Sequence, residues 1–163
     1  MSKQTIALVD TNIWLDNYLG DRPGAAGSRA FLDRAFAERV VLCYAVTTAK
    51  DLFYIIAQAL KAQTRDSGRE VTEEVALAAT ETAWKCVENM REAAIAIGAD
   101  EADLWLAVKY RPLVNDLEDN LIMAAAERAK ADFIVTRDKG LLAKSTVAAH
   151  TPEDALIILD ALR

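Results

Sequence analysis

The chain has 163 residues, of which 53% are apolar, 27% charged and 7% aromatic. That is enough sequence for one domain with a buried core, and the high apolar fraction excludes an intrinsically disordered chain. The 19 Lys and Arg against 25 Asp and Glu leave a formal net charge of −6, unlike the basic balance of a typical duplex reader. An acidic protein can still act on nucleic acid where metal ions supply the positive charge.

No apolar stretch approaches the length of a bilayer span, and the N-terminal apolar run is too short for a signal peptide. We therefore expect one soluble, cytoplasmic domain over residues 1–163, with no membrane contact. Cys43 and Cys86 lie in apolar surroundings outside any CxxC pair, and we expect both to be reduced core thiols. His150 is the single histidine, so Asp and Glu are the ligands available to a metal ion.

Four short apolar runs are typical of buried strands, at residues 5–9, 40–44, 93–97 and 133–136. Continuous apolar runs without alternation favour strands that are covered on both faces, as in a parallel sheet. Between them the apolar period is helical, and we expect helices over residues 28–39, 47–61, 72–87, 100–110 and 116–130 and another from 151. The polar stretch 63–70 is expected to be a loop. This alternation predicts an α/β fold.

Five acids lie near a strand end or a helix start: Asp10, Asp51, Asp116, Asp119 and Asp138. The carboxyl ends of parallel strands meet at one edge of a sheet, so these side chains can converge there. Ordinary roles are open to each of them, because an acid at the start of a helix is a common N-cap and residues 136–138 can form a simple turn.

Two further details concern single acids. Asp51 lies in a helix that is mostly apolar, so we expect it to be buried, with the adjacent Lys50 pointing elsewhere on the helix. Glu118 is one position from Asp119, and we expect it to face away from that residue.

Clustered carboxylates without His or Cys select hard cations such as Mg²⁺ or Mn²⁺. Without a cation such a cluster repels itself and raises its own pKa values. A bound cation would also attract a phosphodiester to an acidic protein. The residues therefore indicate metal-dependent phosphoester hydrolysis.

Four segments resemble, in order and spacing, the motifs of PIN-domain ribonucleases and are most similar to the VapC-like toxins of bacterial toxin–antitoxin pairs. They read IALVDTNI at 6–13, TTAKDL at 47–52, DLEDNLI at 116–122 and IVTRD at 134–138. The resemblance spans residue 5 to about residue 142. It implies a PIN-like α/β/α sandwich with a parallel sheet of about four or five strands.

The same resemblance implies roles for single residues. Asp10, Asp119 and Asp138 match metal-binding acids of the family, and Asp51 stands where the family usually has Glu. Asp116 resembles an extra acid of the branch that carries a D-x-E-D segment. The polar residues that would orient the carboxylates or the attacking water are Asn12 and Thr136.

The implied function is an endoribonuclease that cuts RNA with Mg²⁺ or Mn²⁺, as the toxin of a pair. Such proteins are usually homodimers, inhibited by a small antitoxin. Three cations near the motifs, Lys50, Arg137 and Lys139, are candidates for contacts to RNA phosphates or are solvated surface charges.

Two alternatives remain open. The first is a PIN domain with lost or weak catalysis that acts as a protein- or RNA-binding module, which the Asp at position 51 motivates. The second is another α/β phosphotransfer domain. A receiver domain needs an acid pair and a late lysine, and a haloacid-dehalogenase-like phosphatase needs Asp-x-Asp after the first strand. This chain reads Asp10-Thr11-Asn12 there, which disfavours both.

Overall fold

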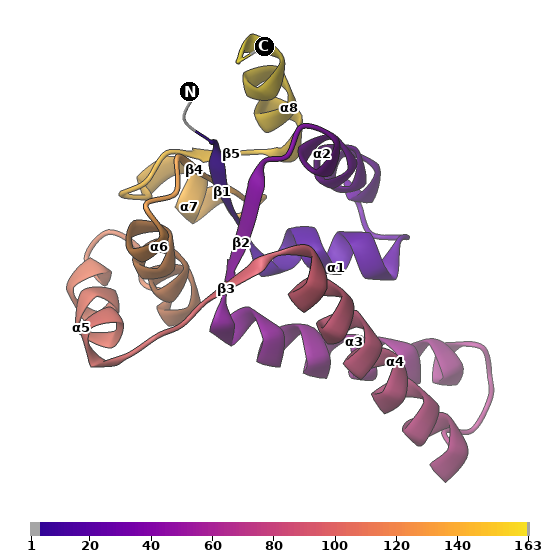
Figure 1. The fold of residues 1–163 in the computed structure, drawn as a ribbon. Helices are drawn as coiled ribbons and strands as arrows, with labels where there is room; N and C mark the ends of the chain where they lie inside the picture. Colours follow the sequence, from indigo (N-terminus) through magenta and orange to yellow (C-terminus); the bar gives the residue numbers. More distant parts are fainter. Residues whose placement is uncertain (1–3, 163) are drawn as a thin grey trace.

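The computed structural model describes residues 4–162 and contains one five-stranded parallel sheet flanked by helices (Figure 1). The strands lie in the spatial order β3-β2-β1-β4-β5. The neighbouring strands β1 and β4 carry the site described below. Every neighbouring pair is parallel. Their bounds are β1 Ile6–Val9, β2 Val41–Ala45, β3 Ile95–Ile97, β4 Phe133–Val135 and β5 Ala149–His150.

Eight helices connect and follow the strands over the described range. They are α1 Thr11–Leu19, α2 Ala25–Ala37, α3 Val46–Asp66, α4 Glu73–Ala93, α5 Glu101–Tyr110, α6 Leu117–Ala129, α7 Lys139–Lys144 and α8 Pro152–Ala161. Several start where a capping side chain predicts it, since Thr72, Asp100, Asp116 and Thr151 each accept a hydrogen bond from a backbone N–H of the helix that follows.

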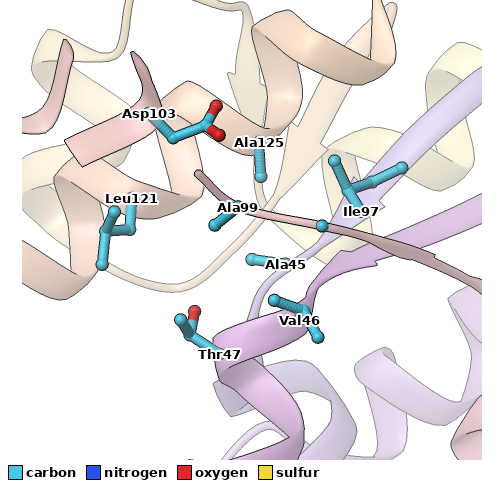
Figure 2. Close-up of a pocket in the computed structure, with 9 residues that line it drawn as sticks. Ala45, Val46, Thr47, Ile97, Ala99, Asp103, Leu121 and Ala125 are labelled. Carbon is cyan, nitrogen blue, oxygen red and sulfur yellow. The ribbon is translucent and has the colours of Figure 1, made fainter. Parts of the chain in front are cut away.

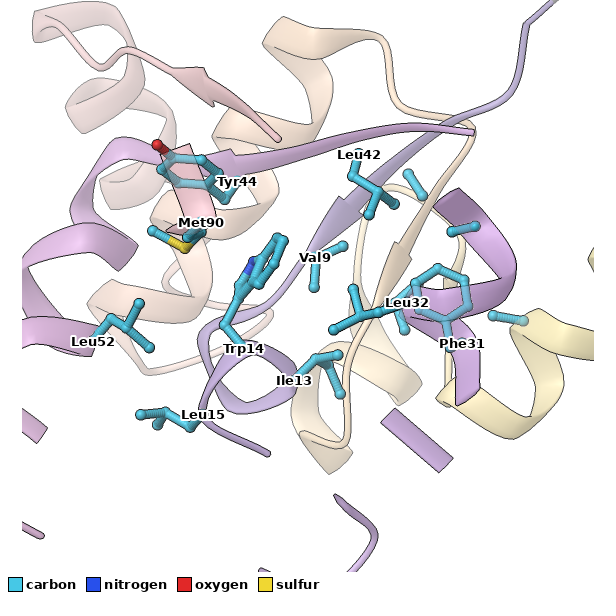
Figure 3. Close-up of a cluster of buried hydrophobic side chains, with 14 of the residues drawn as sticks. Val9, Ile13, Trp14, Leu15, Phe31, Leu32, Leu42, Tyr44, Leu52 and Met90 are labelled. Carbon is cyan, nitrogen blue, oxygen red and sulfur yellow. The ribbon is translucent and has the colours of Figure 1, made fainter. Parts of the chain in front are cut away.

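The two faces of the sheet carry separate cores, which makes the fold an α/β/α sandwich. Successive residues of β1 point to opposite faces: Ala7 and Val9 join one cluster, and Leu8 joins the other. The first cluster packs α1, α2, α3, α4 and α8 against the sheet around the fully buried Trp14 (Figure 3). The second cluster packs α5, α6 and α7 on the opposite face. The expected fold class is confirmed.

The prediction of a loop over residues 63–70 is wrong for its first half. Helix α3 continues to Asp66, and the turn follows at Ser67 and Gly68, where Gly68 has a φ of +74°. The polar residues of this stretch are compatible with a helix because α3 is amphipathic and packs one face on α4. Helix α2 also begins three residues before the expected start, directly after Gly24, whose φ is +85°.

Three short elements were not predicted: α1, α7 and β5. The motif segment after β1 turns at once into α1, and α7 and β5 are too short to produce a period. Within the range that the structure describes, no helix has the length and apolar character needed to cross a membrane.

Candidate active site

The candidate site lies at the carboxyl ends of β1 and β4. From β1 the chain passes to β2 on one side, whereas from β4 it passes to β5 on the other side. The helices that leave these two neighbouring strands therefore diverge, and such a switch point is where open α/β sheets form their binding crevice. Asp10 follows β1 directly, and its backbone N–H donates to the carbonyl of Val135 at the end of β4 at 3.0 Å.

Asp10 is held at the base of this crevice. Its side chain is buried with 3% exposure, and Oδ1 accepts from the backbone N–H of Thr11 at 2.6 Å. Oδ2 accepts from the hydroxyl of Thr136 at 2.6 Å, and the same hydroxyl accepts from the backbone N–H of Asp138 at 2.9 Å. Burial raises the pKa of Asp10, and the hydrogen bond from Thr136 opposes that increase. Thr136 thus connects two of the expected acids.

Asp116 and Asp138 are helix N-caps, as the ordinary interpretation of these acids predicts. Asp116 Oδ1 accepts from the backbone N–H of Asp119 at 3.0 Å, and Asp138 Oδ1 accepts from that of Leu141 at 2.9 Å. Each cap occupies one carboxylate oxygen and leaves the second without a hydrogen-bond donor among the described residues. Capping and a place in an acidic cluster are therefore compatible for both residues.

Asp119 shows that the acids converge. Its pKa is raised to about 7, first by burial and then by the negative charges of Asp138, Asp116, Asp10 and Glu118. Carboxylates raise each other's pKa in this way only when they share a small region. The residues that follow β1 and β4 and those at the start of α6 thus form one acidic cluster.

Glu118 belongs to this cluster, and the expectation that it faces away from Asp119 is wrong. Its Oε1 accepts a long hydrogen bond of 3.4 Å from the hydroxyl of Thr11, which also lies 3.1 Å from the hydroxyl of Thr48. Partial burial raises the pKa of Glu118, followed by the charges of Asp51, Asp10 and Asp116. Position i+1 is turned from its neighbour along a helix, but in the first turn of α6 a long side chain reaches the sheet edge from either position.

Asp51 lies at the margin of the cluster and is less buried than expected. Its side chain is 22% exposed, and Oδ1 pairs with Nζ of the adjacent Lys50 at 3.3 Å, so the expectation that Lys50 points elsewhere is also wrong. Asp51 is the leading charge that raises the pKa of Glu118, but it is absent from the main charges acting on Asp10 and Asp119. Glu118 therefore interacts electrostatically both with Asp51 and with Asp10.

Two residues of the predicted set face another direction. The side-chain oxygen of Asn12 accepts from Nη2 of Arg22 at 3.3 Å, and no described acid contacts it. The guanidinium of Arg137 donates to Asp16, to Ser28, to the carbonyl of Gly24 and to Glu153, so it is committed to the protein rather than to an RNA phosphate.

The donor atoms and charges of these residues suit a hard divalent cation, whereas the distances between the described acids do not give a complete set of ligands. All donors are oxygens, the set carries several negative charges, and mutual repulsion raises the pKa of Asp119. Over residues 4–162, however, no three His, Cys, Asp or Glu side chains stand close enough together to hold a metal ion. The cap bonds of Asp116 and Asp138 each occupy one carboxylate oxygen in this arrangement.

A pocket of mainly apolar lining lies at the ends of β2 and β3, and none of the clustered acids lines it (Figure 2). Val46 and Thr47 at the start of α3 line one side, and Ile97 and Leu121 line others. Leu121 is one turn along α6 from Glu118, so this helix contributes residues both to the pocket and to the acidic cluster.

Comparison with known proteins agrees with this geometry. A sequence model of the PIN domain matches residues 7–140, and the chain belongs to the PIN-domain family, whose members are generally nucleases. No curated protein matches the chain.

Solved structures share the fold at low identity. VapBC2 from Rickettsia felis, determined bound to a DNA fragment from the promoter, has a TM-score of 0.63 and 12% identity over 90% of this chain and 98% of that chain. FitAcB from Neisseria gonorrhoeae has a TM-score of 0.61 and 20% identity over 90% and 97%. PAE2754 from Pyrobaculum aerophilum has a TM-score of 0.57 and 20% identity over 98% and 91%.

Proposed function

We propose that this PIN domain is a metal-dependent endoribonuclease that hydrolyses phosphodiester bonds of RNA at the acidic cluster. The observation that carries the proposal is Asp119, whose pKa is raised to about 7 by burial and by four surrounding carboxylates at the switch point of the sheet. Perturbed carboxyl groups in a crevice are typical of functional sites, and a divalent cation removes this repulsion.

The roles follow from the positions of the acids. Asp10, Asp119 and Asp138 would hold a Mg²⁺ or Mn²⁺ ion, with Asp116 as an additional acid. When bound, such an ion lowers the pKa of a water molecule and stabilises negative charge on the phosphodiester. Thr136 orients Asp10 through its hydroxyl and Asp138 through that residue's backbone. Asn12 orients the arginine that it contacts rather than an acid.

Glu118 changes the role that we assign to Asp51. Asp51 is one methylene shorter than the family's usual Glu, and it is paired with Lys50. Glu118 has the longer side chain, and the charges of both Asp51 and Asp10 raise its pKa. We assign to Glu118 the carboxylate that completes the cluster on this side, with Asp51 as an outer acid that favours the cation through its charge.

The proposed biological setting is a cytoplasmic toxin–antitoxin pair. The shared fold with VapBC2 and FitAcB supports a small antitoxin as the partner. A homodimer is the working form that we propose. Exposed apolar side chains on α5, Leu104, Trp105 and Val108, provide surface of the kind that protein partners cover.

The second candidate is a PIN domain that binds protein or RNA with little or no catalysis. It is favoured by the absence, over residues 4–162, of three acids already arranged around a cation position. Thermal unfolding with Mn²⁺ or with EDTA separates the two functions. The proposed nuclease melts at a higher temperature in Mn²⁺, and Asp10→Asn abolishes the difference, whereas identical wild-type curves favour the binding module.

A further inference from the structure

A second group of charges lies beside the acidic cluster, along α1. Asp16 is in the second turn of this helix and is 1% exposed. Its Oδ1 accepts from Nε of Arg22 at 3.0 Å, and its Oδ2 accepts from the hydroxyl of Ser28 at 2.6 Å and from Nε of Arg137 at 3.3 Å. One buried carboxylate therefore fixes two arginines.

The two guanidinium groups are used differently. Arg137 makes its remaining contacts to the carbonyl of Gly24, the hydroxyl of Ser28 and the carboxylate of Glu153, and so connects the end of β4 to α2 and α8. Arg22 instead reaches back along α1 to its first turn, where Nη2 donates to the side-chain oxygen of Asn12 at 3.3 Å.

Arg22 retains free hydrogen-bonding capacity. A guanidinium has five N–H donors, and the contacts to Asp16 and Asn12 use two of them. No other described residue accepts from this side chain, which is 32% exposed. Asn12 lies in the first turn of α1, whose N-cap is Asp10, so the guanidinium of Arg22 reaches the end of α1 that follows Asp10.

We propose that Arg22 binds a phosphate of the RNA substrate beside the acidic cluster, an inference that rests on the proposed function. A guanidinium matches two phosphate oxygens at once, and Asp16 and Asn12 already hold this one in place, so little rotamer freedom is lost on binding. Of the three cations near the motifs, Arg137 is committed to its four partners and Lys50 pairs with Asp51. Lys139 directly follows Asp138 and makes no ion pair among the described residues, so it is open to a phosphate but is not held in place as Arg22 is.

The salt dependence of RNA binding tests this assignment. Loss of a phosphate contact changes the slope of the logarithm of the binding constant against the logarithm of the salt concentration, whereas a loosened fold does not. Binding of a labelled, unstructured single-stranded RNA is measured by anisotropy over a range of KCl concentrations, in an Asp119→Asn background that suppresses cleavage. Arg22→Gln should weaken binding roughly tenfold. It should also reduce the slope of log K against log salt by about 0.7, the value for one phosphate on a single strand.

Two variants serve as controls. Arg22→Lys keeps the charge and should keep most of the slope. Arg29→Gln removes an exposed α2 arginine that donates to the carbonyl of Gly20 and contacts no candidate site residue, and it should leave the slope unchanged.

Should Arg22→Gln fail to fold, ¹⁵N NMR of the arginine Nε–H groups with Arg22 intact decides the question. RNA should then shift the resonance of Arg22 and not that of Arg29. An unchanged slope in Arg22→Gln, or an unmoved Arg22 resonance, in a protein whose wild type binds and cleaves RNA overturns this inference alone. A wild type that neither binds nor cleaves RNA overturns the proposed function together with it.

Discussion

The hydroxyl of Thr136 donates to Oδ2 of Asp10 at 2.6 Å across 126 positions of sequence, and it connects the ends of the two neighbouring strands β1 and β4. The same oxygen accepts from the backbone N–H of Asp138. A single buried side chain therefore sets the relative position of two acids that the sequence places far apart. The acidic cluster depends on this connection.

Replacing Thr136 by Val tests the connection, because Val keeps the shape and removes both hydrogen bonds. The buried carboxylate of Asp10 then loses the donor to Oδ2 and keeps only the Thr11 N–H on Oδ1, so we expect the free energy of unfolding at neutral pH to fall by roughly 1–3 kcal/mol. Thr136→Ser retains the hydroxyl and should stay near wild type. Denaturant unfolding of the three proteins measures this. Equal stability of Thr136→Val and wild type would contradict the role assigned to the hydroxyl.

The raised pKa of Asp119 predicts how the metal-free protein responds to pH. Its pKa is about 7 in the folded state against 3.8 as the ordinary value, so the folded protein binds more protons than the unfolded chain between these two pH values. The free energy of unfolding in EDTA should therefore decrease as pH rises from about 4 to about 7. For Asp119→Asn, the free energy of unfolding should decrease less over this pH window. Above the window this variant should be more stable than wild type.

The matched control for Asp119 is Asp33→Asn, an exposed acid on α2, which should follow the wild-type pH dependence. In saturating Mn²⁺ the free energy of unfolding of the wild type should instead increase as pH rises, because metal binding requires the ionised carboxylates. A stability that rises with pH in EDTA for wild type would show that Asp119 is not in the environment described.

Glu118→Gln is predicted to impair RNA cleavage, since it removes one negative charge from the cluster while the amide can still accept from Thr11. We expect a loss on the order of 10²-fold, comparable to the loss of one group that stabilises a transition state electrostatically. Glu101→Gln, at an exposed first-turn acid of α5, is the control and should cleave normally. If both variants cleave like wild type, Glu118 is a bystander and Asp51 is the second acid.

Position 51 is tested by exchanging Asp for the family's usual Glu. Asp51→Glu adds one C–C bond, about 1.5 Å of reach, and should strengthen Mn²⁺ binding, because hard cations demand short ligand distances. Asp51→Ala should weaken binding through the lost charge without a loss of folding stability. Isothermal titration with Mn²⁺ compares the three proteins. Indistinguishable affinities would make Asp51 a partner of Lys50 alone.

Much of the fold was predictable from the sequence because its strands are continuous apolar runs and its helices begin at recognisable caps. Thr72, Asp100 and Thr151 start helices in the structure where their side chains predict it. The end of α3 was missed because a polar, amphipathic last turn resembles a loop when only its composition is considered. The two-residue strand β5 depends on pairing with β4, which local sequence does not encode.

Part of the candidate site was predictable because its acids lie at strand ends and helix starts that the sequence reveals. Asp10, Asp119 and Asp138 follow from strand ends and helix starts, whereas the direction of Glu118 depends on how α6 meets the sheet edge. Asp16 directly follows the apolar residues 13–15, and this placement was the one signal that it is buried. Its partners Arg22, Ser28 and Arg137 come from three different segments, and only tertiary structure brings them together.

Cleavage of a single-stranded RNA, with identification of the product ends, tests the central claim most directly. The wild type should cleave in Mn²⁺ or Mg²⁺ and not in EDTA, and Asp10→Asn and Asp119→Asn should each lose activity on the order of 10²-fold or more. Because water is the proposed nucleophile, the products should carry no 2′,3′-cyclic phosphate. Cleavage that persists in EDTA, or products that end in a cyclic phosphate, would contradict a metal-dependent hydrolysis at this acidic cluster.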